Sequence, residues 1–253
     1  MTLNMAQKFY KTEKFQKVFY MSLYFLCVVT FILSGAFIFY RTYFSNVYVS
    51  GASMSPTLVG GAGGRCHYGI SDNHRIAIDN LKRFDVVITY YPNSWVHGDE
   101  DTTYKIKRVW GFPGETISMS FTDNHYTFTV TNTKTSEVIY SINAPVSTKE
   151  YETVGTYTVA TFETKYRTFD THVANGGTYY RQNFTVSLDE TKKEYFVMGD
   201  NWVSSSDSYY HINQSEKLSY DNLQGRVVAI RGTAVVVNGE LTDKKPIYNM
   251  YYF

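Results

Sequence analysis

Two short segments carry side chains that together can cleave a peptide bond. Residues 50–58 read SGASMSPTL and present Ser53 on a loop of small residues. Residues 104–114 read YKIKRVWGFPG and place Lys107 inside an apolar run. A serine hydroxyl is a good nucleophile only when a base removes its proton, and a lysine amine can be that base. The two segments therefore predict acyl transfer by a serine–lysine pair.

Lysine can act as this base only in its neutral form. The reference pKa of its side chain is ~10.4, and loss of solvent can lower that pKa by up to ~3–5. Ile106 and Val109 flank Lys107 in a segment that reads as a strand, and Lys105 projects from the same strand face. A second ammonium group close by lowers the pKa further. We therefore expect Lys107 to lie in a dry setting.

The serine loop suits the same chemistry. Gly51 and its small neighbour leave room for the backbone of a substrate. The N–H of Ser53 is placed to donate to the oxyanion of a tetrahedral intermediate, while glycine at position 51 leaves the second donor open. Val49, Met54 and Ile106 adjoin the pair in sequence and are the candidate walls of a substrate site.

An uncharged segment near the amino terminus predicts a membrane anchor. Residues 18–40 carry no charge, exceed the apolar region of a cleavable signal peptide and are long enough to span a bilayer as a helix. Four lysines precede it, and after it comes Arg41 alone in a neutral stretch. Positive residues stay on the cytoplasmic side. We expect residues 1–17 in the cytoplasm, a single pass through the lipid bilayer, and residues 41–253 outside the cell, with Ser53 close to the membrane.

The remainder of the chain predicts a mostly β, mostly antiparallel domain. Aromatic residues make up 17% of the sequence, including 24 tyrosines, and such side chains favour strands. Asn238-Gly239 is a strong hairpin-turn signal. Residues 118–194 carry no site motif and are predicted to form an inserted β-rich subdomain. The runs that read as strands are 85–91, 104–110, 126–130, 157–161, 194–198, 225–230 and 233–237.

Several classes of function are excluded. The net charge of +1 leaves no footprint for nucleic acid. The glycine-rich stretch at 60–64 lacks the Lys-Ser/Thr of a phosphate loop, so nucleotide binding is rejected. The six histidines are scattered with no metal-binding or hydrolase motif, so we expect no metal and no cofactor. The two cysteines, Cys27 and Cys66, are expected to be free, with Cys66 on a loop.

Four motifs in fixed order, and a fifth closing segment, resemble those of bacterial type I signal peptidases. Residues 50–58 match the serine motif of that family, with Ser53 as the nucleophile. Residues 105–115 match its lysine motif, with Lys107 as the general base, except that Lys105 replaces the usual tyrosine. RFDVV at 83–87 matches the preceding strand. GDNWVSSSDSY at 199–209 matches a later motif, and GRVVA at 225–229 the closing one.

The resemblance implies a membrane-anchored serine endopeptidase that removes signal peptides from secreted or surface pre-proteins, cutting after small residues. By the same match Ser205 hydrogen-bonds and orients the lysine, and Asp207 braces its loop. Ser205 lies in a run of three serines, so a neighbouring serine is the alternative. Asp200 and Asn201 are expected to form a turn rather than to take part in chemistry.

The departures from the family pattern leave two functions open. Trp202 and Tyr209 stand where the family has arginines, so Asp207 is expected to lack its usual ion-pair partner, and Phe84 replaces a glycine. Accessory signal peptidases encoded with pili in Gram-positive bacteria show such drift. Some of these lose the catalytic pair and act in pilin assembly, which makes a non-catalytic factor that holds a pilin segment by strand addition the alternative. The presence of both Ser53 and Lys107 favours catalysis, with pilins among the candidate substrates.

Overall fold

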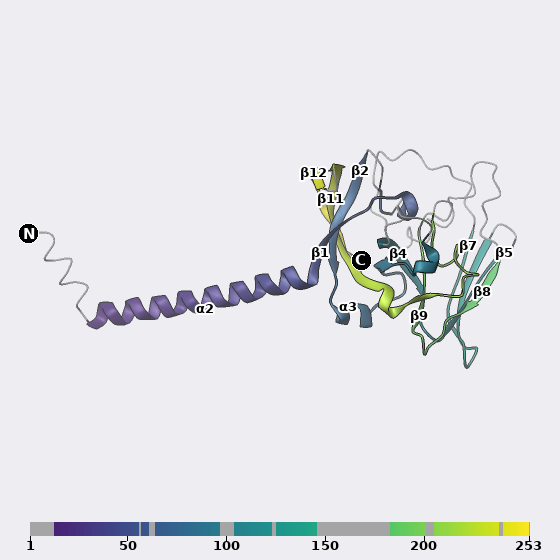
Figure 1. The fold of residues 1–253 in the computed structure, drawn as a ribbon, viewed down its shortest axis with the longest axis horizontal. Helices are drawn as coiled ribbons and strands as arrows, with labels where there is room; N and C mark the ends of the chain where they lie inside the picture. The colour runs from purple at the N-terminus through teal and green to yellow at the C-terminus, as the bar shows by residue number, and fades with distance from the viewer. Residues whose placement is uncertain are drawn as a thin grey trace, which may run out of the picture. The chain divides into compact units, whose positions relative to one another are not determined.

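The chain forms two separate units in the computed structural model (Figure 1). One unit comprises residues 1–44 and the other residues 45–253. The described residues are 13–55, 57–60, 64–96, 104–122, 125–145, 183–200, 205–237 and 240–252.

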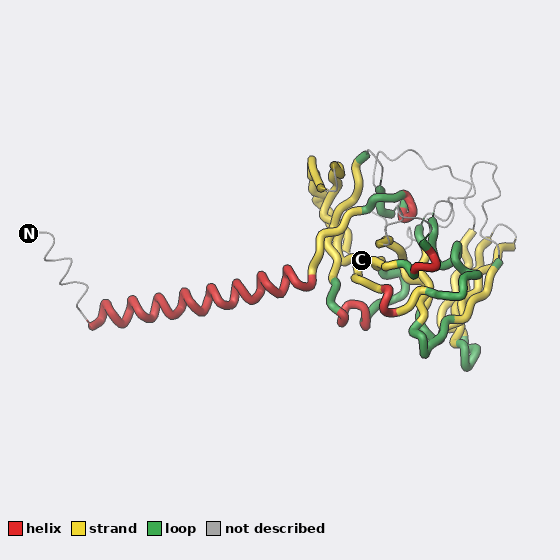
Figure 2. Tube along the Cα trace, viewed as in Figure 1, coloured by secondary structure: helices red, strands yellow, loops and turns green. Residues whose placement is uncertain are grey.

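The first unit contains one long helix, α2 (Glu13–Tyr43), drawn in red in Figure 2. Its 31 residues include none that is buried. At 1.5 Å per residue the helix is more than long enough to cross a bilayer. Within the described part of the chain, α2 is the one helix whose length and composition meet that requirement. The helix extends past the predicted 18–40 segment at both ends, where the flanking residues continue its turns.

The second unit is built on an eight-stranded sheet with the order β1-β2-β11-β3-β4-β9-β10, and β12 pairs with β11. β11 is its central strand because β2, β3 and β12 all pair with it antiparallel. The strands are β1 (Phe44–Tyr48), β2 (Arg65–Asp72), β3 (Val86–Tyr90), β4 (Tyr104–Gly111), β9 (Glu194–Met198), β10 (Leu218–Ser219), β11 (Leu223–Val237) and β12 (Glu240–Tyr252). Short helices between them are η1 (Ala52–Met54), α3 (Arg75–Asp79), η2 (Asn93–Trp95) and η4 (Tyr220–Asn222).

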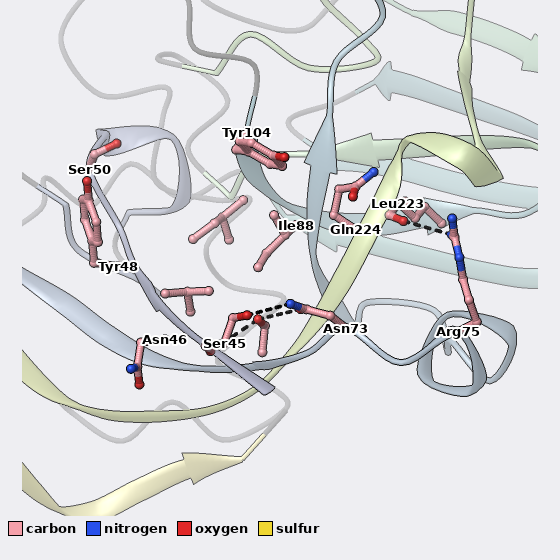
Figure 3. Close-up of a pocket in the computed structure, with 13 residues that line it drawn as sticks. Ser45, Asn46, Tyr48, Ser50, Asn73, Arg75, Ile88, Tyr104, Leu223 and Gln224 are labelled. Carbon is pink, nitrogen blue, oxygen red and sulfur yellow. Dashed lines mark hydrogen bonds between the residues drawn. The ribbon is translucent and has the colours of Figure 1, made fainter. Parts of the chain in front are cut away.

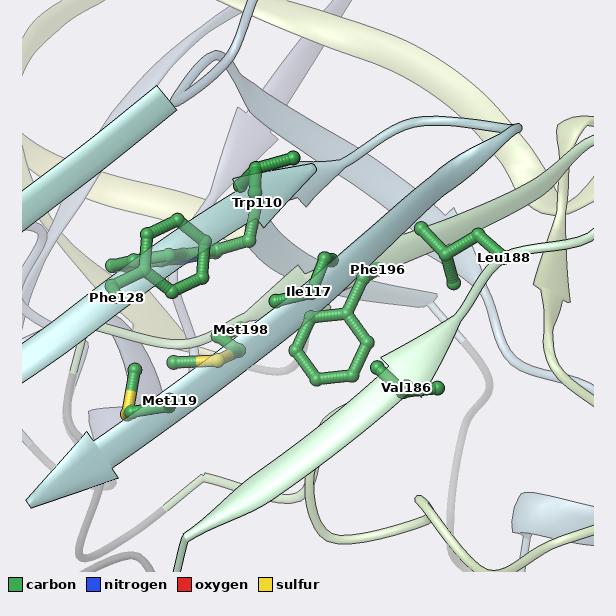
Figure 4. Close-up of a cluster of buried hydrophobic side chains, with 9 residues drawn as sticks. Trp110, Ile117, Met119, Phe128, Val186, Leu188, Phe196 and Met198 are labelled. Atoms are coloured by element: carbon green, nitrogen blue, oxygen red, sulfur yellow. The ribbon is translucent and has the colours of Figure 1, made fainter. Parts of the chain in front are cut away.

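A second, four-stranded antiparallel sheet packs against the first through a shared core. Its order is β7-β6-β5-β8, with β5 (Glu115–Thr122), β6 (His125–Asn132), β7 (Val138–Pro145) and β8 (Phe184–Ser187). Trp110 and Met198 of the large sheet meet Ile117 and Phe128 of the small one (Figure 4). The rings of Trp110 and Phe128 pack edge to face, with their centroids 4.7 Å apart. This core packs against one face of β4, the strand that carries Lys107.

The predicted antiparallel β architecture is confirmed, and β3, β4, β6 and β9 coincide with predicted strands. The two runs at 225–230 and 233–237 are one continuous strand, β11, because Gly232 lets the backbone pass close to the carbonyl of Lys245 without a break. The predicted strand 157–161 and the turn 238–239 lie outside the described residues. The small sheet occupies part of the region 118–194, whose status as an inserted subdomain stays a prediction.

The expected loop position of Cys66 is wrong. Cys66 lies on β2 opposite Ala234 of β11 and is only 1% exposed. The glycine-rich stretch before it hides the strand, since Arg-Cys-His has no alternation of its own. Both cysteines are free, as expected.

Phe84 occupies a backbone conformation that explains the usual glycine at this position. Its φ is 73°, in the left-handed region that favours glycine. The ring packs edge to face against Trp110 and Tyr140, with centroid distances of 5.1 and 5.5 Å. Phe84 thus adds an aromatic contact between the two sheets at the cost of backbone strain of about 1–3 kcal/mol.

Candidate active site

Ser53 and Lys107, 54 positions apart in sequence, are in direct contact. The Nζ of Lys107 lies 2.7 Å from the Oγ of Ser53, which is hydrogen-bond distance. Ser53 belongs to the single turn η1 and Lys107 to strand β4. Lys107 is 2% exposed. Removal of an amine from water disfavours its ammonium form, so this position favours the neutral base that the chemistry requires.

The sheet explains why the amine is buried. Lys107 pairs with Val87 of β3, and Val87 is fully buried. Next to this pair, Val86 and Met54 belong to one apolar cluster that packs the serine loop onto the sheet. Lys107 therefore lies on the same face of the sheet as the buried Val87, and its amine lies at the serine.

His67 closes the serine loop at its base. Its carbonyl accepts a hydrogen bond from the N–H of Val49 at 3.0 Å, and its own N–H donates to the carbonyl of Val59 at 2.8 Å. Its ring Nδ1 accepts a third hydrogen bond from the N–H of Val59 at 3.1 Å. The two ends of the segment that carries Ser53 are thus tied to β2 at one residue. Gly60 completes the closure, because a side chain there would overlap the carbonyl of Gly51.

Acid is expected to destabilise the fold through His67. Burial lowers the pKa of the His67 ring from its usual 6.5 to about 4, so the unfolded chain takes up a proton first. The contribution of the neutral ring is therefore complete above about pH 6.5 and is lost as the pH falls toward 4, amounting to about 3 kcal/mol.

Urea unfolding of the detergent-solubilised chain between pH 7.5 and 4 measures this loss. A matched His67→Asn variant, whose amide oxygen replaces Nδ1 as the acceptor, is expected to have a flatter stability profile over that range. Identical profiles for the two proteins would contradict the assignment.

A cleft of about 350 Å³ lies over the Ser53–Lys107 pair and brings the predicted wall residues together. Val49, Met54 and Ile106, the candidate wall residues, all line it. Lys105 lines the same cleft, as expected for a residue on the same strand face as Lys107. Gly51 lies at the rim, where a side chain would meet nothing within 4 Å. The residues from both motifs therefore surround one opening that can accept an extended peptide.

Asp207 organises the loop beside the pair. Its buried carboxylate accepts hydrogen bonds from the Oγ of Ser205 at 2.7 Å and the N–H of Gly199 at 3.0 Å. Gly199 is itself pressed against the serine loop, since a Cβ there would lie 2.4 Å from the carbonyl oxygen of Ser53 and 2.3 Å from the Oγ of Ser205. Ser205, Gly199 and Ser53 therefore form one packed layer. Ser206, the neighbouring serine, lines the cleft.

Asp200 is more than the turn-former expected from the sequence. Its carboxylate forms a bidentate pair with the guanidinium of Arg108, at 2.7 and 2.6 Å, and both side chains are buried. Arg108 also donates to the carbonyl of Phe84 at 2.7 Å. A buried ion pair with full hydrogen bonding fixes the geometry of the groups it joins. The pair ties the residue next to Lys107 to the loop that carries Asp207, a link that sequence spacing does not reveal.

Tyr209 stands where the family pattern has an arginine, and it makes contacts of a different kind. Its backbone N–H donates to the Oδ1 of Asp207 at 3.1 Å, while its ring packs against Phe184 at a centroid distance of 5.2 Å. The Tyr209 ring thus packs against the core between the two sheets, and its backbone N–H hydrogen-bonds the carboxylate of Asp207. Trp202 and Asn201 lie outside the described residues.

The second unit is a β domain in which a buried lysine contacts a serine at the base of a cleft that can hold a peptide. This is the arrangement of a serine peptidase that uses no catalytic histidine. The chain matches the family model "Signal peptidase, peptidase S26" over residues 21–231. It is 31% identical over 172 residues to "Signal peptidase I" of Streptococcus pneumoniae strain TIGR4 and equally to that of strain R6, covering 66% of this chain and 73% of each relative. No solved structure matches the chain.

The chain therefore belongs to the signal peptidase family, peptidase S26. Its class of activity is that of a serine endopeptidase that processes signal peptides. The resemblance read from the motifs is confirmed.

Proposed function

We propose that the chain is a membrane-anchored signal peptidase that works through a dyad of Ser53 and Lys107. The observation that carries this proposal is the 2.7 Å contact between the Oγ of Ser53 and the Nζ of a lysine that is 2% exposed. At this distance a neutral amine can take the hydroxyl proton directly. Helix α2 anchors the enzyme, with residues 1–17 in the cytoplasm and the second unit outside the cell.

In the first half of the reaction the Oγ of Ser53 attacks the carbonyl carbon of the scissile bond as Lys107 accepts its proton. The negative charge moves to the carbonyl oxygen. The N–H of Ser53 lies in the first turn of η1, where helical amides have no acceptor within the helix, and it donates to this oxyanion. The ammonium of Lys107 then protonates the leaving amine, the C–N bond breaks, and an ester to Ser53 remains.

In the second half a water molecule takes the place of the departed amine. Neutral Lys107 removes a proton from this water, and the hydroxide attacks the ester carbonyl. Collapse of the second tetrahedral intermediate breaks the C–O bond, and the proton returns to the Oγ of Ser53. The signal peptide leaves with a new carboxylate.

The supporting residues hold this geometry. We assign Ser205 and Asp207 as positioning residues, because Asp207 fixes both the Ser205 hydroxyl and Gly199, which packs on Ser53. Val49, Met54 and Ile106 form the apolar walls that take small side chains before the cut. Gly51 leaves the rim open to the substrate backbone.

Incubation of the full chain in detergent with a pre-protein whose signal peptide ends in small residues tests the proposal. We expect one cut after a small residue, and a loss of at least about a thousandfold in rate for Ser53→Ala. Lys134→Arg, which changes a surface lysine paired with Glu190, is the control and should cleave normally.

Binding of the pre-protein without any cut, unchanged in Ser53→Ala, would contradict catalysis. It would instead support the non-catalytic factor that holds pilin segments. Pilin precursors and unrelated secreted precursors, compared side by side, show whether the enzyme is dedicated to pili.

A further inference from the structure

We propose that a hollow beside the catalytic cleft selects signal peptides that carry an acidic side chain several residues before the cleaved bond, and that Arg75 recognises this charge. The inference rests on the proposed function, because it concerns how the same site chooses its substrate. Four observations carry it: the shared lining of the hollow and the cleft, the direction of the chain, a polar floor and a single cation.

The hollow adjoins the catalytic cleft. It has a volume of about 760 Å³ and shares Tyr48, Ser50, Tyr104 and Ile106 with the smaller opening over Ser53. Figure 3 shows Tyr48 and Ser50 on one side of the hollow and Arg75 on the other. A peptide seated at Ser53 therefore has a path into the hollow, and the same residues bound both.

The direction of β1 indicates which part of the substrate enters the hollow. β1 leads from the end of α2 toward the serine loop, and the hollow follows β1 from Ser50 back to Ser45. A signal peptide also leaves the membrane before it reaches Ser53, so the residues before its cut run beside β1. Ser45 to Tyr48 line the hollow and stand eight to five residues before Ser53, so an extended peptide that runs alongside them places its side chains at about five to eight positions before the cut in the hollow.

The floor of the hollow is polar and fixed. The amide nitrogen of Asn73 donates to the Oγ of Ser45 at 2.9 Å, and its amide oxygen accepts from the Oγ of Ser71 at 2.8 Å (Figure 3). Gly225 lies so close to this amide that a side chain there would overlap it. Gln224 adds a second amide to the wall. A polar or charged side chain keeps its hydrogen bonds at this floor, while Val47, Ile88, Ile106 and Leu223 give the rest of the hollow apolar walls for its stem.

Arg75 is the one charged side chain among the residues that line the hollow in the described part of the chain. Its Nη1 donates to the carbonyl of Leu223 at 3.3 Å, and its guanidinium lies 5.0 Å from the ring centroid of Tyr220. These contacts hold the group in place. A guanidinium carries five N–H donors in a planar fork suited to a carboxylate.

The nearby carboxylates have other donors. Asp79, on the same short helix as Arg75, accepts from the hydroxyl of Tyr220 at 2.7 Å. Asp72 accepts from the N–H of His74 at 2.9 Å. An acidic side chain in the substrate is thus the natural partner for the exposed fork of Arg75.

Three pre-proteins that differ only in charge test the proposal. They carry Asp, Ala or Lys at one of the positions five to eight before the cut, and each position is tried in turn with the full chain in detergent. We expect kcat/KM for Asp to exceed that for Ala about fivefold at one or two adjacent positions, the size of a partly exposed ion pair. Lys is expected to be the poorest substrate there.

Two variants of Arg75 make the test specific. Arg75→Glu should reverse the order so that Lys is preferred over Asp, and Arg75→Gln should remove the preference. Because each preference is a ratio within one variant, a general loss of activity does not affect it. The same order of Asp, Ala and Lys in wild type and in both variants would overturn the inference.

Three further outcomes also overturn it, and they separate its failure from that of the proposed function. Normal cleavage of the Ala pre-protein by the wild type with no effect of charge would leave the proposed function standing and remove Arg75 from recognition. Failure of the wild type to cleave any pre-protein would contradict both the proposed function and the role of Arg75. A loss in Arg75→Gln that is equal for all pre-proteins and appears only in vesicles with anionic lipid would assign Arg75 to lipid headgroups instead.

Discussion

Replacement of Lys107 by arginine is expected to abolish cleavage while the fold is kept. The guanidinium stays protonated at any accessible pH, so it cannot take the proton of Ser53. General base catalysis by a positioned side chain contributes about 10²–10⁴ to the rate, and removal of one member of a catalytic unit often costs more. We therefore expect a loss of at least about a thousandfold in kcat.

The fold of Lys107→Arg is checked by circular dichroism and by binding of the uncut pre-protein. A larger cation at a buried position also costs stability, so Lys107→Met, which has a similar length and no charge, serves as the matched variant. Met should be folded and equally inactive. Appreciable turnover by either variant would remove Lys107 as the base.

Gly199→Ala is expected to have the largest effect of any change outside the Ser53–Lys107 pair, although the residue touches no substrate. Its Cβ would lie 2.4 Å from the carbonyl oxygen of Ser53 and 2.3 Å from the Oγ of Ser205. These separations are about 1 Å shorter than an ordinary contact, so the serine loop or the Ser205 loop must move. Displacement of a reacting group by about 1 Å can cost about a hundredfold in rate.

Comparison with Gly64→Ala separates this effect from a general loss of glycine. A side chain at position 64 would meet nothing within 4 Å, so that variant should match wild type. We expect Gly199→Ala to lose about a hundredfold in kcat. Wild-type turnover by Gly199→Ala would show that the packed layer between Ser53 and Ser205 does not set the geometry.

The sequence is sufficient to indicate candidate site residues because its motifs are short and ordered. Ser53 and Lys107 were singled out by residue type and by their apolar or small neighbours, and the structure places them in contact. The strand that carries Lys107 was predicted with nearly the observed bounds because its alternation is strong. Their mutual distance could not be predicted, since it depends on how β3 and β4 pair and on how η1 packs.

The contacts that hold the site in place had no signal in the sequence. His67 closes the serine loop mainly through backbone hydrogen bonds, which any residue type can make. Asp200 looked like a turn residue because its partner, Arg108, lies far away in the chain. Phe84 looked like a simple substitution of glycine, whereas its positive φ shows that the backbone shape is kept and an aromatic contact is added.

Titration of the Lys107 amine in the native enzyme tests the account most directly. The full chain labelled with ¹³C at lysine Cε gives one signal per lysine in detergent, and the signal of Lys107 is the one missing from Lys107→Arg. We predict that this amine loses its proton at a lower pH than the exposed lysines of the chain, because burial disfavours its ammonium form, and that kcat/KM rises with pH over the same range. An amine at position 107 that keeps its proton until the pH range of ordinary lysines, in an enzyme that cleaves at neutral pH, would contradict the mechanism.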